Sequence, residues 1–293
     1  MRIRATVAAV SGALALSALA VPAAQADGPG DGNPTKTSAA ERFGTSSAKS
    51  SAKSTARVAA AAAPTVSSVK VNGGKNIVLG TTTVKTFSVS LTASHPSGIA
   101  DAYVDLWHGT DVEAGLDGYL PPNEDVATCT ATSATTSNCK LTITAEPGYE
   151  GNVYANFLAG TWKVSAGVLA NDGEMFWDDY YKTHKVQRLS KLTVNASPEP
   201  VTKGKTLTVT GKLSRANWET GSYSGLPSGQ SVALQFRKSG TSTYTNVKGI
   251  KTAAGGALKT TVTAATDGYH RFKYAGITST APATAAGDFV DVK

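Results

Sequence analysis

The sequence predicts an all-β protein made of two consecutive β-sandwiches. Apolar and polar residues alternate in many short runs, Gly, Pro, Asn and Asp cluster between these runs, and the charge changes sign partway along the chain. The clearest stretch is 186–213, where two alternating runs flank two prolines: Leu192, Val194 and Ala196, then Leu207, Val209 and Leu213. A strand, a proline break and a second strand are typical of the opening of an immunoglobulin-like sandwich, so an earlier domain must end here.

Residues 1–26 are predicted to be a secretory signal peptide. Arg2 and Arg4 precede an apolar run over 5–21, and Ala24-Gln25-Ala26 matches the small-residue cleavage pattern. A membrane anchor is the alternative, but this run is short for a spanning helix and no later run approaches that length. We therefore expect a secreted, extracellular protein that has no membrane contact after the signal peptide is cleaved. Association with the cell wall is compatible with this location.

Residues 27–64 are predicted to form a disordered linker. Gly, Ser, Ala, Lys and Pro dominate the segment, which holds almost no large apolar side chain. Such a composition cannot bury enough surface to offset the entropy of ordering the chain.

Residues 65–187 are predicted to form the first, acidic sandwich. Val69 and Val71 are expected to face Ile77 and Leu79 in a hairpin, because Asn72-Gly73-Gly74 between them suits a tight turn. Residues 108–125 lack a regular pattern and are expected to be a long polar loop, and Trp162 is expected in the core. The remaining strands are predicted from alternating runs at 84–93, 99–107, 162–170 and 176–186.

Two cysteines, Cys129 and Cys139, flank a Ser/Thr-rich tip in this domain. In an exported protein an even pair at this spacing implies one disulfide. A metal site would need two more soft ligands, which the sequence does not supply.

Residues 188–293 are predicted to form the second, basic sandwich, which has no cysteine. Its 14 Lys/Arg residues outnumber its 5 acids by 9, whereas the first domain has 13 acids against 7 Lys/Arg. A basic domain could attract an anionic wall polymer or nucleic acid. Export and the lack of a recognised nucleic-acid module argue against nucleic acid.

The chain resembles a group of exported actinomycete proteins with tandem immunoglobulin-like domains, which often carry the label "calcium-binding protein". The resemblance is carried by SPEPVTKGKTLTVTGKL and DGYHRFKYAG in the second domain, and by VKVNGGKNIVLGTTTVKTFSVSLTASHPSGI and GTWKVSAGVLANDG in the first. It implies the two-sandwich fold and calcium binding, but it transfers no individual ligand residue and no catalytic activity.

Calcium needs six to eight oxygen ligands, and the chain has no EF-hand or glycine-aspartate repeat, so any site must be built from loops. Two acidic groups of the first domain are candidates, one in the 108–125 loop and one around the turn near 172. The predicted ligands are Asp101, Asp111, Asp117, Asp172, Glu174 and Asp178. The alternative is that these acids keep the loops hydrated or pair weakly with lysines.

A carbohydrate or cell-wall adhesion surface is the second functional hypothesis. Trp107, Trp177 and Tyr181 lie beside acids, and aromatic rings next to hydroxyl-binding carboxylates suit a sugar-binding face. Alternatively, these rings fill the core of a small sandwich. No catalytic motif is present and the four histidines are scattered, so we expect a non-catalytic protein and, as a third option, a structural spacer.

Overall fold

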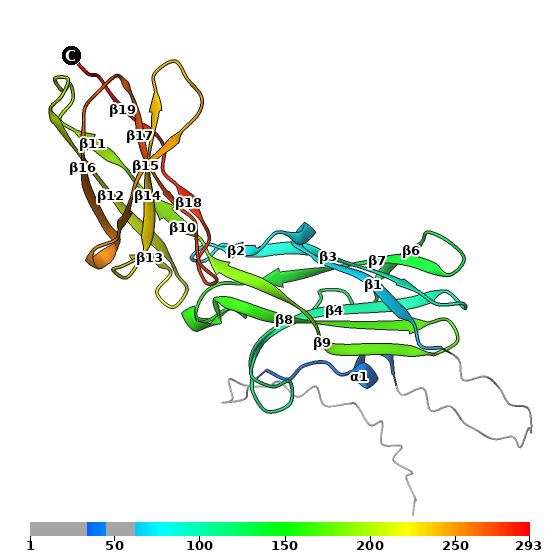
Figure 1. Cartoon of the computed structure of the whole chain (residues 1–293). Coiled ribbons are helices and arrows are strands. Elements are labelled where there is room, and N and C mark those ends of the chain that lie inside the picture. Colours follow the sequence, from blue (N-terminus) through cyan, green and yellow to red (C-terminus); the bar gives the residue numbers. More distant parts are fainter. Residues whose placement is uncertain (1–33, 45–61) are drawn as a thin grey trace, which may run out of the picture. The chain divides into compact units, whose positions relative to one another are not determined.

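The computed structural model describes residues 34–44 and 62–293, which form two immunoglobulin-like β-sandwiches (Figure 1). The predicted signal peptide, 1–26, lies outside the described residues, as does much of the predicted linker. Within the described part of the chain, the search for helices of membrane-spanning length and apolarity finds no candidate.

The first sandwich contains two sheets that pack their apolar faces together. One has the order β1-β3-β7-β6 and the other the order β2-β9-β8-β4-β5. The strands of the first sheet are β1 (Thr65–Val71), β3 (Lys85–Ser94), β7 (Thr136–Ala145) and β6 (Thr128–Ala131). The strands of the second are β2 (Ile77–Leu79), β9 (Met175–Arg188), β8 (Gly160–Ala170), β4 (Ile99–Gly109) and β5 (Leu116–Leu120).

Two local predictions for this sandwich were wrong. Residues Asn72–Gly74 form a short 3-10 turn, η1, after which β2 joins the other sheet and pairs in parallel with β9 instead of forming a hairpin with β1. The turn residues do have the positive φ that their types suggest, but the turn carries the chain between sheets. Within the predicted loop 108–125, Leu116 and Leu120 are buried and belong to β5, which pairs with β4.

The core of the first sandwich follows the predicted alternation. Ala102, Val104 and Leu106 of β4 lie on the same inner face of the sheet as Trp162 and Val164 of β8, and all five are buried. The Trp162 indole is 0% exposed, and its Nε1 donates a hydrogen bond to the Leu158 carbonyl of the short turn η2 (Asn156–Leu158) at 2.7 Å.

The predicted disulfide is present and joins Cys129 to Cys139. The two cysteines are directly opposite each other in the β6–β7 pair. Cys139 is buried in the core, so the bridge attaches the edge strand β6 to the sandwich interior.

The predicted linker is ordered over residues 34–44, which is a correction to the sequence prediction. The short helix α1 (Ala39–Phe43) is capped by Ser38, whose hydroxyl accepts a hydrogen bond from the Glu41 amide while the Glu41 carboxylate accepts one from the Ser38 amide. In Figure 1, α1 lies beside β8 and β9, and Phe43 makes an edge contact with Trp177 of β9. The segment packs on the first sandwich, and this contact buries side chains such as Lys36, which the composition of the segment alone does not predict.

The second sandwich also contains two layers. One is built around β12 (Thr206–Asn217), with β10 (Ser190–Leu192), β11 (Asn195–Ser197), β13 (Ser222–Gly225) and β16 (Ala257–Thr263) as its neighbours. The other has the order β15-β14-β17-β18, and β19 also pairs with β17. Its strands are β15 (Thr245–Lys251), β14 (Ser231–Lys238), β17 (Gly268–Tyr274), β18 (Ala283–Thr284) and β19 (Asp288–Val290). A 3-10 turn, η3 (Ala254–Gly256), precedes β16.

The apolar residues of this sandwich form a second core cluster around Leu207, Leu234 and Phe272, each 0% exposed. Trp218, which follows β12, belongs instead to the first cluster, and its Nε1 donates to the Gly80 carbonyl at 2.9 Å. The domain boundary at 187/188 remains a prediction. Trp218 lies after this boundary in the sequence but packs into the core of the first sandwich.

Candidate functional site

Strand β4 of the first sandwich is buried on both faces from Asp101 to Trp107. Its inward residues fill the core, whereas Tyr103, Asp105 and Trp107 point the other way, toward the side that a sandwich usually exposes to water. Asp105 and Trp107 are 0% exposed, and Tyr103 is 2% exposed. A buried carboxylate on an outer sheet face needs a partner, which identifies this face as the candidate site.

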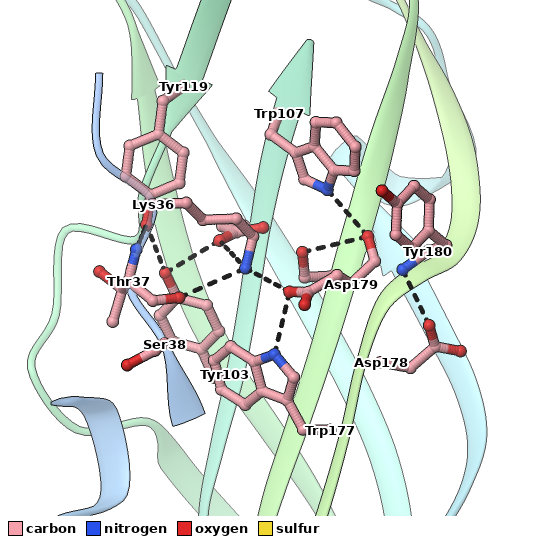
Figure 2. Close-up of polar contacts among 12 residues, drawn as sticks. Lys36, Thr37, Ser38, Tyr103, Trp107, Tyr119, Trp177, Asp178, Asp179 and Tyr180 are labelled. Atoms are coloured by element: carbon pink, nitrogen blue, oxygen red, sulfur yellow. Dashed lines mark hydrogen bonds and ion pairs between the residues drawn. The ribbon is translucent and has the colours of Figure 1, made fainter. Parts of the chain in front are cut away.

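The partner is Lys36 of the docked segment. Figure 2 shows its side chain reaching between the strands, where Nζ lies 2.6 Å from Asp179 Oδ1. The same Nζ lies 3.2 Å from Asp105 Oδ2. The side chains of Lys36 and Asp105 are 3% and 0% exposed, whereas that of Asp179 is 27% exposed. One ammonium group is therefore held between two carboxylates with almost no access to water.

Aromatic rings enclose this ion cluster. Lys36 Nζ lies 4.9 Å from the ring centroid of Trp177, and Tyr103 stacks on Trp177 at a centroid distance of 5.0 Å. Gly167 of β8 makes room for the indole, because a Cβ there would lie 2.4 Å from the ring of Trp177. The rings exclude water and add cation–π attraction to the Coulomb attraction of the two acids.

Hydroxyl groups complete the cluster. The Tyr103 hydroxyl donates to Asp105 Oδ2 at 3.0 Å and shares a 2.7 Å contact with the hydroxyl of Tyr119, which accepts from the Thr37 amide at 3.2 Å. Burial raises the pKa of Asp105, although Lys36 opposes this rise. Burial and the charge of Asp105 together raise the pKa of Tyr103, so this phenol stays protonated as a donor. Asp105 Oδ1 is buried without a hydrogen-bond partner among the described residues.

A second ion pair fixes the other end of the segment. Arg42 Nη2 lies 3.1 Å from Asp101 Oδ2, and the guanidinium also donates to the main-chain carbonyls of Ala102 and Glu124. Asp101 Oδ1 accepts from the Ala127 amide at 2.8 Å. Asp101, predicted as a calcium ligand, thus serves as the acceptor for the docked segment.

Four of the other five predicted calcium ligands have a local partner for their carboxylates, whereas Glu174 contributes its main-chain amide. Asp111 Oδ1 accepts from the Glu113 amide at 2.9 Å, and Asp117 Oδ1 lies 2.6 Å from His108 Nδ1. Asp178 Oδ1 accepts from the Tyr180 amide at 2.8 Å.

Near the turn at 172 the pattern is the same, because Asp172 Oδ1 accepts from the amide of Glu174 at 3.2 Å. Among the described residues, no group of three or more His, Cys, Asp or Glu side chains is arranged to hold a metal ion. The arrangement does not fit the six to eight converging oxygens that calcium prefers.

The three aromatic residues of the carbohydrate hypothesis do not share one exposed face. Trp107 is 0% exposed and its Nε1 donates to the Asp179 carbonyl at 2.8 Å. Trp177 lies under Phe43 and Lys36 on the same outer face. Tyr181 packs against the core of the sandwich from β9.

The second sandwich carries a different feature, which we call the Arg/Tyr face, on β14, β17 and the residues next to them. The Arg271 guanidinium lies 3.6 Å from the ring centroid of Tyr244, and that of Arg237 lies 4.0 Å from the centroid of Tyr269. Tyr269 also packs on Phe289 of β19 at 5.2 Å. Among the described residues, neither arginine forms an ion pair with a carboxylate.

Hydrogen bonds and a glycine hold the Arg/Tyr face in place. Arg271 Nε donates to Gln235 Oε1 at 2.9 Å. A Cβ at Gly287 would lie 2.1 Å from the Tyr244 hydroxyl, so only glycine leaves room for this tyrosine. The two arginine residues are half-buried, and their guanidinium groups are pre-positioned and retain free N–H donors.

The sequence prediction missed Lys36 and Asp105, and it gave no role to Tyr103. Asp105 alternates with apolar residues and so resembles an ordinary solvent-facing position, while the composition of the linker hides Lys36. The sequence did hold one indication of the site. Tyr103, Asp105 and Trp107 alternate along a central strand, and an outer sheet face with two large aromatic residues is usually covered by another part of the chain.

No family model matches the sequence, and no curated protein matches it. Solved structures similar to this chain include domains A168–A170 of titin, at 9% identity and a TM-score of 0.24, covering 78% of this chain and 68% of that one. The Yersinia pseudotuberculosis adhesin InvE matches at 14% identity and a TM-score of 0.25, covering 76% of this chain and 58% of InvE. The D00–D0 domain of intimin matches at 13% identity and a TM-score of 0.24, covering 76% and 98%.

Proposed function

We propose that this chain is an exported, non-catalytic binding protein that attaches to an anionic polymer of the cell envelope through the Arg/Tyr face. The supporting observation is the pair of arginines, Arg237 and Arg271, each stacked on a tyrosine without a carboxylate partner among the described residues. A planar guanidinium held in this way presents parallel N–H donors that match the oxygens of a phosphate or carboxylate group.

The surroundings favour a polymer over a small isolated anion. The segment 188–293 has a net charge of +9, which attracts a polyanion over long range. Exposed Lys273 lies two residues after Arg271 in β17, so its side chain is on the same face of the sheet. Phe289 is 40% exposed beside Tyr269, so sugar rings of a polymer could stack on aromatic surface between charged contacts.

The test is retention of the full chain on immobilised polymers with three chemistries. One polymer is a phosphodiester such as poly(glycerol phosphate), one is a polycarboxylate such as polygalacturonate, and the third is neutral dextran. We expect retention on at least one polyanion but not on dextran, and weaker retention as salt rises because exposed charges are screened. The polyanion that retains the chain identifies the anionic group.

The double variant Arg237→Ala/Arg271→Ala should bind the retaining polyanion more than about tenfold more weakly, since each charge-assisted hydrogen bond contributes about 1.5–3 kcal/mol. A matched control is Lys203→Ala/Lys205→Ala, which removes the same charge from exposed positions outside the Arg/Tyr face. Equal weakening in both double variants would show diffuse attraction by net charge and would contradict a defined site.

A further inference from the structure

We propose that Lys36 and Asp105 condense to form a side-chain amide bond, which joins the 34–44 segment covalently to strand β4. Three features of the site support this reaction. The Lys36 amine is within contact distance of the Asp105 carboxyl group, both side chains are almost fully buried, and a second carboxylate lies against the same amine. These are a nucleophile, an electrophile and a base brought together in one water-poor site.

Asp105 is the acceptor because it is the carboxyl group best suited to remain neutral. An ionised carboxylate resists attack by an amine, whereas the neutral acid has an electrophilic carbon. The complete burial of Asp105 favours that neutral form. The Tyr103 hydroxyl donates to Oδ2 and polarises the carboxyl group, while Oδ1 has no partner among the described residues and can depart.

Asp179 is placed to act as the base. Its Oδ1 is the carboxylate oxygen nearer to Lys36 Nζ, at 2.6 Å compared with 3.2 Å for Asp105. The Trp177 Nε1 donates to the same oxygen at 2.9 Å and holds it in position. Asp179 is also 27% exposed and lines an open cavity with Thr37, so a proton that it accepts can pass to water.

The reaction balances without a further reagent. Asp179 takes one proton from the Lys36 ammonium, and the neutral amine attacks the carboxyl carbon of protonated Asp105. The C–N bond forms, the bond from that carbon to Oδ1 breaks, and the departing hydroxyl leaves as water with a second proton from Nζ. Asp179 then returns its proton to solvent, so the net products are an amide, one water molecule and one proton.

Burial also gives the condensation a driving force. Holding the Lys36 ammonium away from water carries a desolvation cost that its attraction to Asp179 only partly offsets. The amide replaces the Lys36 and Asp105 groups with one neutral group under the rings of Trp177 and Tyr103. The Coulomb contact would thereby become a permanent link between the N-terminal segment and the sandwich.

The test is the intact mass of the folded full chain, purified, reduced and measured under denaturing conditions. We expect the mass to be lower than the sequence mass by one water molecule. Lys36→Arg keeps the positive charge but cannot form this amide, so it should have its full sequence mass. Tryptic digestion of the wild-type chain should give a branched peptide that joins the residues around Lys36 to those around Asp105.

A folded wild-type chain with its full sequence mass and no branched peptide would overturn the proposal and leave an ordinary ion pair. Because this result concerns the unmutated chain, no folding defect of a variant can obscure it. Asp179→Asn should slow the mass loss in freshly made protein, whereas Asp178→Asn, the neighbouring control, should not. Equal rates in the two variants would contradict the role of Asp179 as the base.

Discussion

The two sandwiches differ in how they hold positively charged side chains on a sheet face. In the first, Lys36 is 3% exposed under aromatic rings and contacts two carboxylates. In the second, Arg237 and Arg271 are half-buried on tyrosine rings and have no carboxylate partner among the described residues. A buried cation must be neutralised within the protein, whereas a cation that still meets water can remain available to a ligand.

This difference separates a stabilising face from a binding face. The outer face of β4 is already occupied by the chain's own 34–44 segment, and changes there should therefore affect stability. The Arg/Tyr face is pre-positioned but open, and changes there should affect retention on polyanions.

The largest expected effect is that of Lys36→Met on stability. The substitution leaves Asp105 buried without Lys36, whether the two form an ion pair or an amide, and breaking one side of a buried pair costs about 3–5 kcal/mol. Chemical denaturation should show this loss in the free energy of unfolding. Lys293→Met is the matched control, since its partner Asp291 is 3.6 Å away and its side chain is 70% exposed, so a change below about 1 kcal/mol is expected. Similar values for both variants would remove the distinction between the covered and open faces.

Loss of the disulfide should have the next largest effect, and only the first sandwich contains one. Replacing Cys129 and Cys139 with alanine removes the constraint on a short loop, for which the chain-entropy model gives about 3 kcal/mol. Hydrogen exchange should show faster exchange in β6 and β7, while amides of β14 and β17 keep their protection. Equal loss of protection in all four strands would show that the two cores unfold as one unit, as the position of Trp218 would allow.

The repeated alternation of side chains predicted most strands and the burial of Trp162, and the pair of cysteines in an exported chain predicted the disulfide. It failed where pairing depends on distant strands. The turn at Asn72–Gly74 is locally suited to a hairpin, but β2 pairs with β9 in the other sheet, where Ile77 and Leu79 are buried in the core. Strand β5 was missed because Asp117 and Gly118 interrupt its short apolar pattern.

The candidate site was less predictable than the fold. The ion cluster joins residues far apart in the sequence, Lys36, Asp105 and Asp179, and no local pattern links them. Composition averages over the whole of 27–64, so it cannot distinguish one docked stretch from its neighbours. For the Arg/Tyr face, the sequence indicated only a basic second domain. The stacking of each arginine on a tyrosine depends on which strands become neighbours, and the sequence pattern does not give this pairing.

A smaller effect is expected from pH in the second sandwich. Burial lowers the pKa of His270, and Asp288 only partly opposes this. Below its usual pKa of about 6.5 the unfolded chain binds a proton more readily than the folded chain, so stability should fall as pH drops through this range and level off below the folded pKa. Denaturation at neutral and mildly acidic pH should show a smaller decrease for His270→Leu than for the wild type. An unchanged decrease would assign the effect elsewhere, with His184 of the first sandwich as the next candidate because burial also lowers its pKa.

The smallest expected effect is that of calcium on the first sandwich. Calcium binding remains a prediction from sequence, but five of the six predicted ligand carboxylates are engaged locally and no group of three converges among the described residues. We expect the melting temperature in millimolar calcium to equal that in chelator, because a ligand stabilises the fold only by binding the native state. A rise that chelator reverses would contradict this expectation. Comparing Asp111→Asn/Asp117→Asn with Asp172→Asn/Asp178→Asn would then locate the ion in the β4–β5 loop or beside β9, and would give the first sandwich a ligand-binding role of its own.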